Sequence, residues 1–275
     1  MSSTPSSSFS VDVAAGIASV SLLGPGKGNA MGPAFWSECA GVFQALDVDD
    51  AVRVVVLRGS GKVFSYGLDL MAMAAELGPL LAAGAGPVER TRLLDVIQRM
   101  QGAPHSIFLC RKPVIAAVHG WCIGGGLDVA AACDVRMCSQ GARFSLREVK
   151  VGMVADVGSL QRLPFIIGEG LTRELALSGR DIDAARALQI GLVSEVADDD
   201  DALFVRAMAA AAEIAANPPL VVQGIKRVMN ARIAKDIEEG LRAVASWNAA
   251  FLGSEDLTEA MVAFAEKRTP VFQGR

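Results

Sequence analysis

The sequence predicts an α/β protein in which a core of repeated strand–strand–helix units is followed by a helical C-terminal region. Two apolar, β-branched segments, VRVVVLR at 52–58 and PVIAAVH at 113–119, are typical of strands buried on both faces. Short strands at 135–138 and 143–146 follow a helix that is predicted at 127–133. Beyond residue 201 the pattern is helical throughout.

The remaining elements are predicted from turn residues and apolar spacing. Before residue 127 they are, in chain order, one or two strands within 11–23, a helix at 33–46, a helix and then a mobile loop within 71–90, a helix at 90–101 and a glycine-rich bend at 120–126. After the acidic run 198–201, which predicts a loop with an N-cap, helices are expected at 202–216, 220–230, 233–252 and 254–266. We therefore expect a core with the active site over 1–200 and a helical oligomerisation region over 201–275.

Composition and charge narrow the class of protein. Of 275 residues, 52% are hydrophobic and 20% are charged, which suits a compact globular chain. A net charge of −4 gives no support to a nucleic-acid partner. Five cysteines without a CxxC pair predict buried, reduced thiols, and two histidines are too few for a histidine-rich metal site.

Both ends of the sequence bear on location. Residues 1–10 are rich in serine and lack the basic and apolar parts of a secretory or transit peptide, so they predict a frayed tail. The last residues, Gln273-Gly274-Arg275, are not a peroxisomal signal. No apolar run is long enough to span a membrane. We expect a cytoplasmic protein without a membrane partner.

Three consecutive glycines, Gly124, Gly125 and Gly126, precede a predicted helix. Such a turn leaves main-chain N–H groups free and lets a ligand approach them closely. Amides of this kind stabilise a developing oxyanion by about 3 kcal/mol. A phosphate-binding loop fits less well, because the P-loop lysine and the G-x-G-x-x-G spacing are missing. A tight turn that only serves helix–strand packing remains open.

Three acidic residues are candidates for proton transfer. Asp128 lies two residues beyond the glycines, and Glu148 and Asp156 lie among valines and methionine. An acid with apolar neighbours tends to have a raised pKa, which suits general acid–base catalysis. Taken singly, each acid has a structural alternative: a first-turn helix acid for Asp128 and partnered surface acids for the other two.

Three segments together, FSYGLDL at 64–70, GGGLD at 124–128 and EVKVGMVADVGSLQR at 148–162, resemble the crotonase (enoyl-CoA hydratase/isomerase) family. The resemblance runs from residue 29 to residue 268 and implies a crotonase-like spiral of repeated β-β-α units. It also implies an acyl-CoA thioester substrate, no cofactor beyond the CoA of that substrate, and a homotrimer or a hexamer. In this family two amides bind the thioester oxygen as it becomes an enolate; the resemblance assigns them to Tyr66 and Gly125.

Within the family the acids match the dienoyl-CoA isomerases. Enoyl-CoA hydratases usually carry glutamate at the first two positions and glycine where this chain has Asp156. The resemblance implies that a 3,5-dienoyl-CoA is shifted to a 2,4-dienoyl-CoA in fatty-acid β-oxidation. Glu148 would serve the transfer beside the thioester carbonyl, Asp156 the transfer at the far end of the diene, and Asp128 would orient or tune both.

The resemblance further implies a CoA-binding region formed largely by main-chain atoms, with the residues Ala30, Ser65, Gly67, Leu68, Asp69, Leu70 and Gly126. Phe264 and Lys267 match a C-terminal element that reaches the CoA of a neighbouring subunit; helix packing and a solvated lysine are their structural alternatives. Tyr66 departs from the small residue usual in the family, and we expect its ring to narrow or redirect the acyl pocket.

Two other functions compete with isomerisation. The first is an enoyl-CoA hydratase in which Asp128 replaces a glutamate. The second is a non-catalytic acyl-CoA-binding, scaffold or RNA-binding relative; the retained acids and glycines and the acidic net charge speak against it.

Overall fold

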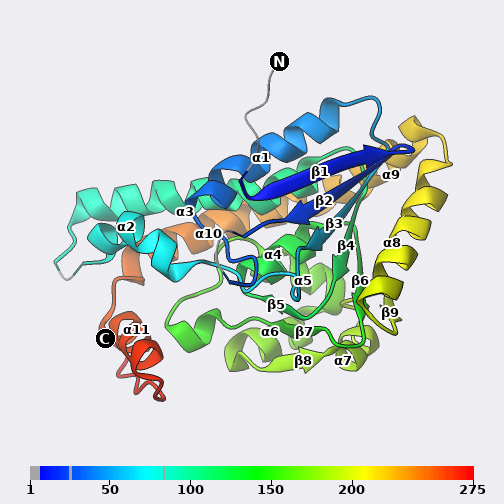
Figure 1. Cartoon of the computed structure of the whole chain (residues 1–275). Coiled ribbons are helices and arrows are strands. Elements are labelled where there is room, and N and C mark those ends of the chain that lie inside the picture. Colours follow the sequence, from blue (N-terminus) through cyan, green and yellow to red (C-terminus); the bar gives the residue numbers. More distant parts are fainter. Residues whose placement is uncertain (1–6, 25–26, 83) are drawn as a thin grey trace.

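A computed structural model describes residues 7–24, 27–82 and 84–275, where the chain forms a main sheet, a small sheet and surrounding helices (Figure 1). The strands are β1 (Phe9–Ala14), β2 (Ile17–Leu22), β3 (Val54–Gly59), β4 (Val114–Val118), β5 (Trp121–Ile123), β6 (Val135–Ser139), β7 (Arg143–Ser145), β8 (Asp181–Asp183) and β9 (Glu195–Ala197). The helices are α1 (Pro33–Val48), α2 (Leu70–Leu81), α3 (Pro87–Leu109), α4 (Gly125–Ala132), the 3-10 helix η1 (Glu148–Val151), α5 (Ser159–Ile167), α6 (Glu169–Ser178), α7 (Ala184–Gln189), α8 (Asp200–Ala215), α9 (Pro219–Ala231), α10 (Ala234–Phe251) and α11 (Glu255–Glu266).

The main sheet has the strand order β1-β2-β3-β4-β6-β9 and the small sheet the order β5-β7-β8. Apart from the antiparallel pairs β1–β2 and β7–β8, neighbouring strands are parallel. Strands β3 and β4, predicted from their apolar runs, are central and almost wholly buried. The predicted strand–strand–helix order is confirmed in β4-β5-α4 and in β6-β7 followed by η1 and α5.

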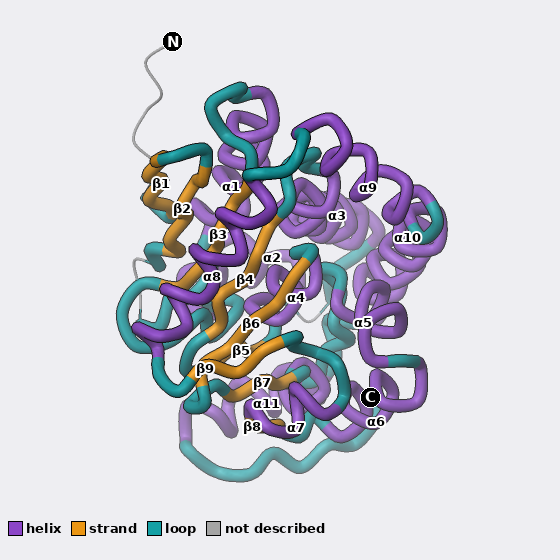
Figure 2. The backbone as a smooth tube through the Cα atoms, turned by 90° about the vertical axis from the view of Figure 1, so that its right-hand side faces the viewer, coloured by secondary structure: helices purple, strands orange, loops and turns teal. Residues whose placement is uncertain are grey.

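Helices cover both faces of the main sheet. On one face α1, α3 and α4 enclose the largest hydrophobic cluster, which includes Phe43, Leu57, Phe64 and Leu127. On the other face α8 packs against β2, β3, β4 and β6, and Figure 2 shows α8 in front of the sheet. Although α8 lies beyond residue 200, it therefore completes the core, and the division of the chain at residue 200 stays a prediction.

The sequence missed several short elements. Strand β5 lies inside the predicted glycine-rich bend, helix α3 is longer than predicted at both ends, and the elements α5, α6, β8, α7 and β9 were not predicted. A three-residue strand is too short to show alternation, which explains the loss of β5, β8 and β9. The frayed tail that was predicted for residues 1–10 does not extend past residue 8, since Phe9 is buried and begins β1. Residues 1–6 of that tail lie outside the described residues, as do residues 25–26 and 83.

The C-terminal helices match their predicted ranges closely, and Asp199 caps α8 by accepting a hydrogen bond from the N–H of Ala202. Helix α10 packs on α3, and α11 packs against η1. Over the parts of the chain that the structure describes, no helix is long and apolar enough to cross a bilayer. All five cysteines are free and buried, as predicted.

Candidate active site

The glycine triplet follows β5 and begins helix α4. Gly124 has a φ of 51°, a left-handed conformation that favours glycine, and α4 starts at Gly125. As the first helical residue, Gly125 has an N–H group with no acceptor inside the helix. A methyl group on Gly126 would lie 2.9 Å from the carbonyl oxygen of Ser65, so the triplet also allows close packing. The amide of Gly125 is thus free to bind an oxyanion.

The second predicted amide, that of Tyr66, is not free. Its N–H donates a hydrogen bond to the carbonyl oxygen of Gly28 at 2.9 Å. The assignment of Tyr66 to the oxyanion hole is therefore wrong. Its ring lies against Gly28, where a methyl group would be 2.1 Å from a ring carbon, and the residue is 37% exposed. The ring packs on the turn before α1, and nothing in these contacts places it in the acid cluster.

Leu68 supplies the amide that Tyr66 cannot. The residues on either side of Leu68 pair with Met31. The N–H of Met31 donates to the carbonyl oxygen of Gly67, and the N–H of Asp69 donates to the carbonyl oxygen of Met31. Among the described residues, the N–H of Leu68 has no acceptor. A methyl group on Gly67 would lie 3.0 Å from the nitrogen of Gly125. Since Gly67 is bonded directly to the nitrogen of Leu68, the amides of Leu68 and Gly125 lie close together.

Asp128 lies in the first turn of α4 and is fully buried. Its Oδ1 accepts a hydrogen bond from the N–H of Ser159, whereas Oδ2 has no partner among the described residues. Burial raises the pKa of Asp128 to about 7, an effect that the hydrogen bonds from Ser159 oppose. The buried carboxyl group of Asp128 is therefore only partly ionised near neutral pH.

Glu148 begins η1, and its Oε1 is close to the glycine triplet. A methyl group on Gly124 would lie 3.1 Å from Oε1, and Oε2 is buried without a partner among the described residues. Burial, and then the charge of Asp128, raise the pKa of Glu148 to about 8. This carboxyl group therefore lies beside the free amide of Gly125 and tends to keep its proton.

Asp156 lies in the loop between η1 and α5. Its Oδ2 accepts a hydrogen bond of 2.8 Å from Asn248 on α10, and its carbonyl oxygen accepts one of 2.7 Å from Gln101 on α3. Desolvation raises the pKa of Asp156 to about 6, and the Asn248 hydrogen bond opposes that rise. Because the charge of Asp156 also raises the pKa values of Asp128 and Glu148, the three acids form one interacting cluster.

Sequence analysis missed Asn248 and Gln101. Both are buried polar residues on helices whose neighbouring positions are apolar. Asn248 also donates a hydrogen bond to the main-chain oxygen of Val154, and Gln101 donates one to that of Leu241. A buried amide on an apolar helix face was the available signal. The two side chains fix the position of the Asp156 loop.

Replacing Asn248 with leucine is expected to raise the pKa of Asp156, because the substitution removes a hydrogen bond that stabilises the ionised form of Asp156. A smaller fraction of Asp156 is then ionised near neutral pH, so the acidic limb of the pH–rate profile should move to higher pH. Asn230→Leu is a matched control, since Asn230 bonds the main chain at Phe108. An acidic limb that stays in place in Asn248→Leu would contradict this role.

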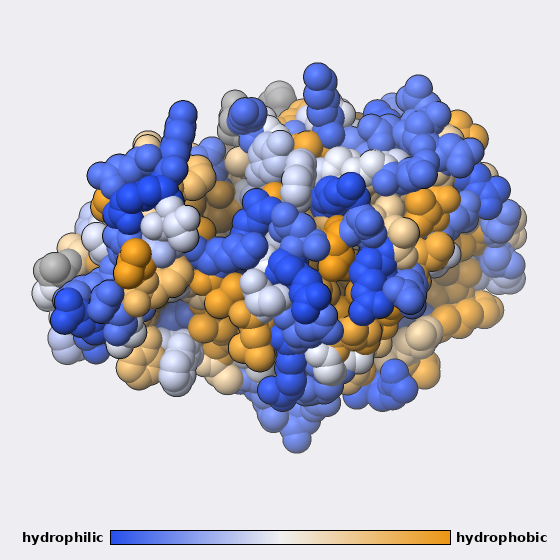
Figure 3. Space-filling view, turned by 90° about the horizontal axis from the view of Figure 1, so that it is seen from below, coloured by the Kyte–Doolittle hydropathy of each residue, from blue (hydrophilic) through white to orange (hydrophobic). Residues whose placement is uncertain are grey.

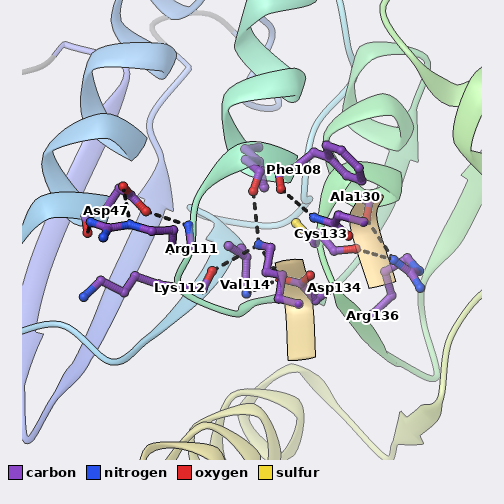
Figure 4. Close-up of polar contacts among 12 residues, drawn as sticks. Asp47, Phe108, Arg111, Lys112, Val114, Ala130, Cys133, Asp134 and Arg136 are labelled. Atoms are coloured by element: carbon purple, nitrogen blue, oxygen red, sulfur yellow. Dashed lines mark hydrogen bonds and ion pairs between the residues drawn. The ribbon is translucent and has the colours of Figure 1, made fainter. Parts of the chain in front are cut away.

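The opposite end of α4 is anchored by charged side chains. Figure 4 shows Arg136 beside the carbonyl oxygens of Ala130 and Cys133; its Nη1 donates to Cys133 at 2.7 Å. The Oδ2 of Asp134 accepts from the N–H of Val114 and pairs with Lys226 of α9, both at 2.7 Å. The helix that carries Gly125 and Asp128 is therefore fixed at its far end to β4 and to α9.

The predicted CoA-binding residues fall into two groups. Ser65 is buried, and its Oγ donates to the oxygen of Asn29 and accepts from the N–H of Gly67, so its side chain supports the loop. Asp69 caps α2 by accepting from the N–H of Ala72. Gly67 and Gly126 are buried as well, and the partly exposed members are Ala30, Leu68, Asp69 and Leu70.

Phe264 and Lys267 lie on and directly after α11. Phe264 is 73% exposed, and Lys267 ends the helix with a φ of 56°. Helix α11 packs against η1 of its own chain, where a methyl group on Gly152 would lie 3.1 Å from the Cα of Leu257. Within the described ranges, no group of three or more histidine, cysteine or acidic residues is arranged to hold a metal ion.

The arrangement defines a site for enolate chemistry: two free amides lie close together, Glu148 lies beside the glycine triplet, and Asp128 and Asp156 interact electrostatically with Glu148. The chain matches the enoyl-CoA hydratase/isomerase family model over residues 12–275 and belongs to this family. The solved enoyl-CoA hydratase/isomerase from Xanthobacter autotrophicus Py2 is 30% identical, with a TM-score of 0.84 over 95% of this chain and 94% of that one. The predicted fold class is thereby confirmed.

Curated relatives carry a more specific name. The mitochondrial Delta(3,5)-Delta(2,4)-dienoyl-CoA isomerase of Dictyostelium discoideum is 42% identical and covers 94% of this chain and 87% of its own length. The mouse mitochondrial protein of the same name is 44% identical, covering 90% of this chain and 76% of its own. The peroxisomal protein of Arabidopsis thaliana is 40% identical, with coverages of 90% and 89%.

Proposed function

We propose that this chain is an isomerase that shifts a 3,5-dienoyl-CoA to a 2,4-dienoyl-CoA, in fatty-acid β-oxidation. The observation that carries the proposal is Asp156, a desolvated acid held by Asn248 in one cluster with Glu148 and Asp128. Isomerisation needs acid–base groups at both ends of the diene, which a second carboxyl group beyond Glu148 provides. The names of the relatives at 40–44% identity support the same reaction.

The geometry suggests how the residues divide the reaction. The amides of Leu68 and Gly125 bind the thioester oxygen, and Glu148, beside Gly124, lies next to the carbon that carries the acidic proton. The reactive form of the pair carries its one proton on Asp156. In that form Glu148 takes the proton from C2, the electrons move along the diene, and Asp156 gives its proton to C6. Each turnover leaves the proton on Glu148 instead of Asp156. The two carboxyl groups must therefore exchange a proton before the next turnover in the same direction.

The direct test supplies purified protein with a 3,5-dienoyl-CoA and follows the ultraviolet absorbance of the conjugated 2,4-product. Turnover by the wild type and its collapse in Asp156→Gly are expected. Rapid hydration of crotonyl-CoA that survives Asp156→Gly, without dienoyl turnover, would replace the proposal with the hydratase. Tight acyl-CoA binding without any turnover would indicate the non-catalytic relative.

The pH–rate profile of kcat/KM should be bell-shaped, with limbs near pH 6 and pH 8. Between the pKa of about 6 for Asp156 and the pKa of about 8 for Glu148, the pair of carboxyl groups holds one proton and can supply both a base and an acid. Below this range the pair lacks a base, and above it the pair lacks an acid. The limbs belong to the coupled cluster rather than to single residues. Activity that rises steadily through pH 9, about one unit beyond the basic limb, would contradict the need for a protonated acid.

We propose a homotrimer or a hexamer, without a cofactor beyond the CoA of the substrate. Helix α9 supports assembly: its buried member is Lys226, whereas Leu220, Val221, Ile225, Val228 and Met229 are exposed. Hydrophobic patches also interrupt the hydrophilic surface that Figure 3 shows from below. Exposed Phe264, with Lys267, is available to the CoA of a neighbouring subunit. Sedimentation analysis tests the assembly, and a monomer at micromolar concentration would refute it.

The cytoplasmic location stays a prediction. The relatives named above are mitochondrial or peroxisomal. Fractionation of cells that express the full chain decides between these compartments.

A further inference from the structure

A cavity of about 310 Å³ adjoins the chain segment that runs from Glu148 to Asp156. Three parts of the chain border it: that segment, the C-terminal half of α10 with the turn after it, and the C-terminal tail beyond α11. Its apolar wall includes Met153, Val154, Trp247, Phe251 and Phe272. The ring centres of Trp247 and Phe251 are 4.6 Å apart, and both side chains are exposed. The cavity is thus an apolar hollow, open to solvent, beside two of the proposed proton-transfer acids.

The polar side chains of the cavity wall are already bonded to the protein. Asn248 donates to the carboxyl group of Asp156 at 2.8 Å. Ser254 caps α11, and the two carboxyl oxygens of Asp256 accept hydrogen bonds of 2.6 and 2.8 Å from the N–H groups of residues 273 and 274. Since these groups have partners, the cavity offers a ligand mainly apolar surface. A hydrocarbon chain, which leaves no polar group unpaired, suits such a wall.

Asn248 connects this cavity to the acid cluster. Its side chain donates to Oδ2 of Asp156 and to the carbonyl oxygen of Val154, and Asn248 and Val154 both line the cavity. Glu148 and Asp156 each keep some exposed surface, whereas Asp128 has none. A substrate can therefore touch the first two acids, and of these Asp156 is the one bonded to the cavity wall.

We propose that this cavity binds the part of the acyl chain beyond C6, and that Phe251 and Phe272 determine the chain length that the site accepts. The inference rests on the proposed function, which places C2 beside Glu148 and C6 beside Asp156. A volume of about 310 Å³ has room for about ten groups of roughly 30 Å³, the size of a water molecule or a methylene. The substrate class is therefore a 3,5-dienoyl-CoA of medium to long chain length.

A larger cavity, of about 820 Å³, does not offer the same continuation. It is lined by α9 and by the C-terminal end of α4, including Ala131 and Ala132. The oxyanion-binding residue Gly125 lies at the opposite end of α4. No residue from 148 to 156 lines this larger cavity, so it does not adjoin the segment of Glu148 and Asp156.

The C-terminal tail, residues 268–275, holds Phe272 at the cavity. On one side of Phe272 the N–H of Val271 donates to Glu259 at 2.8 Å, and on the other side the tail is bonded to Asp256. The side chain of Arg275 pairs with Glu255. Figure 1 shows the C-terminus beside α11. A change of the Phe272 side chain therefore alters the cavity wall while the bonds of the tail main chain remain possible.

The first test measures binding of two saturated thioesters by calorimetry. The chain of hexanoyl-CoA ends at C6, whereas that of dodecanoyl-CoA extends six carbons further. Each methylene that is fully buried strengthens binding about fourfold. Because the cavity is open on one side, we expect the wild type to bind dodecanoyl-CoA about tenfold more tightly, or better, than hexanoyl-CoA. Equal affinity for the two thioesters would overturn the proposal.

Variants of the wall show where the longer chain lies. Phe272→Asp places a charge against the chain and should remove most of the preference for dodecanoyl-CoA, with a much smaller effect on hexanoyl-CoA. Phe251→Ser, which removes a ring from α10, should act in the same direction. Leu177→Asp, at an exposed leucine of α6 that does not line the cavity, is the matched control and should keep the preference. A preference that survives in both cavity variants, or an equal loss of affinity for both thioesters, would overturn the proposal.

Kinetics extend the test to the reaction. Phe272→Asp should raise KM about tenfold for 3,5-dodecadienoyl-CoA and much less for 3,5-hexadienoyl-CoA. If neither substrate turned over, the proposed isomerase function would fail, whereas the binding preference would still decide the role of the cavity. Sedimentation separates a competing occupant. If Phe272→Asp weakened the assembly and left the chain-length preference intact, a second copy of the chain would cover the cavity, and the proposal would be wrong.

Discussion

Replacing Glu148 with glutamine is expected to lower kcat for dienoyl isomerisation about a thousandfold, with a much smaller change in KM. Glutamine keeps the shape of the side chain but can neither take nor give a proton. Glu148 lies beside Gly124 and has a pKa of about 8, the highest of the three acids, so no other group in the cluster replaces it. Steady-state kinetics on the 3,5-dienoyl-CoA measure the effect.

The control for this substitution is Glu213→Gln, at an exposed glutamate on α8. Thermal unfolding of both variants separates catalysis from stability. Since Glu148, with a pKa of about 8, is already largely uncharged near neutral pH, the neutral glutamine should leave the stability close to that of the wild type. If Glu148→Gln kept more than about a tenth of the activity, Glu148 would not be a proton-transfer group.

Replacing Gly67 with alanine is expected to lower kcat about a hundredfold or more by displacing both oxyanion-binding amides. The new methyl group would lie 2.6 Å from the oxygen of Ile123 and 3.0 Å from the nitrogen of Gly125. The main chain must shift to relieve these contacts, and the N–H groups of Leu68 and Gly125 shift with it. Kinetics and the affinity for an enolate-like thioester analogue should fall together.

Gly61→Ala is the matched control for this change. Gly61 has a φ of 67°, similar to the 80° of Gly67, but a methyl group there meets no atom within 4 Å. Both variants carry the left-handed strain of about 1 kcal/mol, and only Gly67→Ala disturbs the amides. Equal activity of the two variants would show that the amide of Leu68 does not bind the thioester oxygen.

Long apolar patterns made much of the fold predictable. Strands β3 and β4 have continuous β-branched sequences, and α8 begins at an acidic N-cap. Strand β5 was missed because its three residues lie among glycines and are stabilised by pairing with β7 rather than by local preference. The packing of α8 on the sheet was equally hidden, since a helical pattern does not reveal which surface the helix covers.

The candidate site was predictable at its acids and only in part at its amides. Motif resemblance identified Asp128, Glu148 and Asp156, which burial makes electrostatically coupled. It assigned the first amide to Tyr66, two residues before Leu68. Which amide is free depends on which N–H groups of residues 65–69 pair with neighbouring chain segments. The carbonyl oxygen of Gly28 accepts from the N–H of Tyr66 and that of Met31 from the N–H of Asp69, which leaves the N–H of Leu68 free among the described residues. Asn248 and Gln101 act from distant helices, so the three motif segments could not identify them, and the signal that they offered was an amide side chain on an apolar helix face.

The pairing of Ser65 with Cys122 of β5 has a consequence for how this scaffold diversifies. Both amides follow within a few residues of that pairing, at Leu68 and Gly125, so a short stretch of parallel backbone fixes their spacing. Glu148 and Asp156, by contrast, are carried by η1 and a loop. Substitutions that move or delete a carboxylate therefore leave the enolate-binding amides intact. One thioester-activating unit can thus acquire different reactions as the acids around it change.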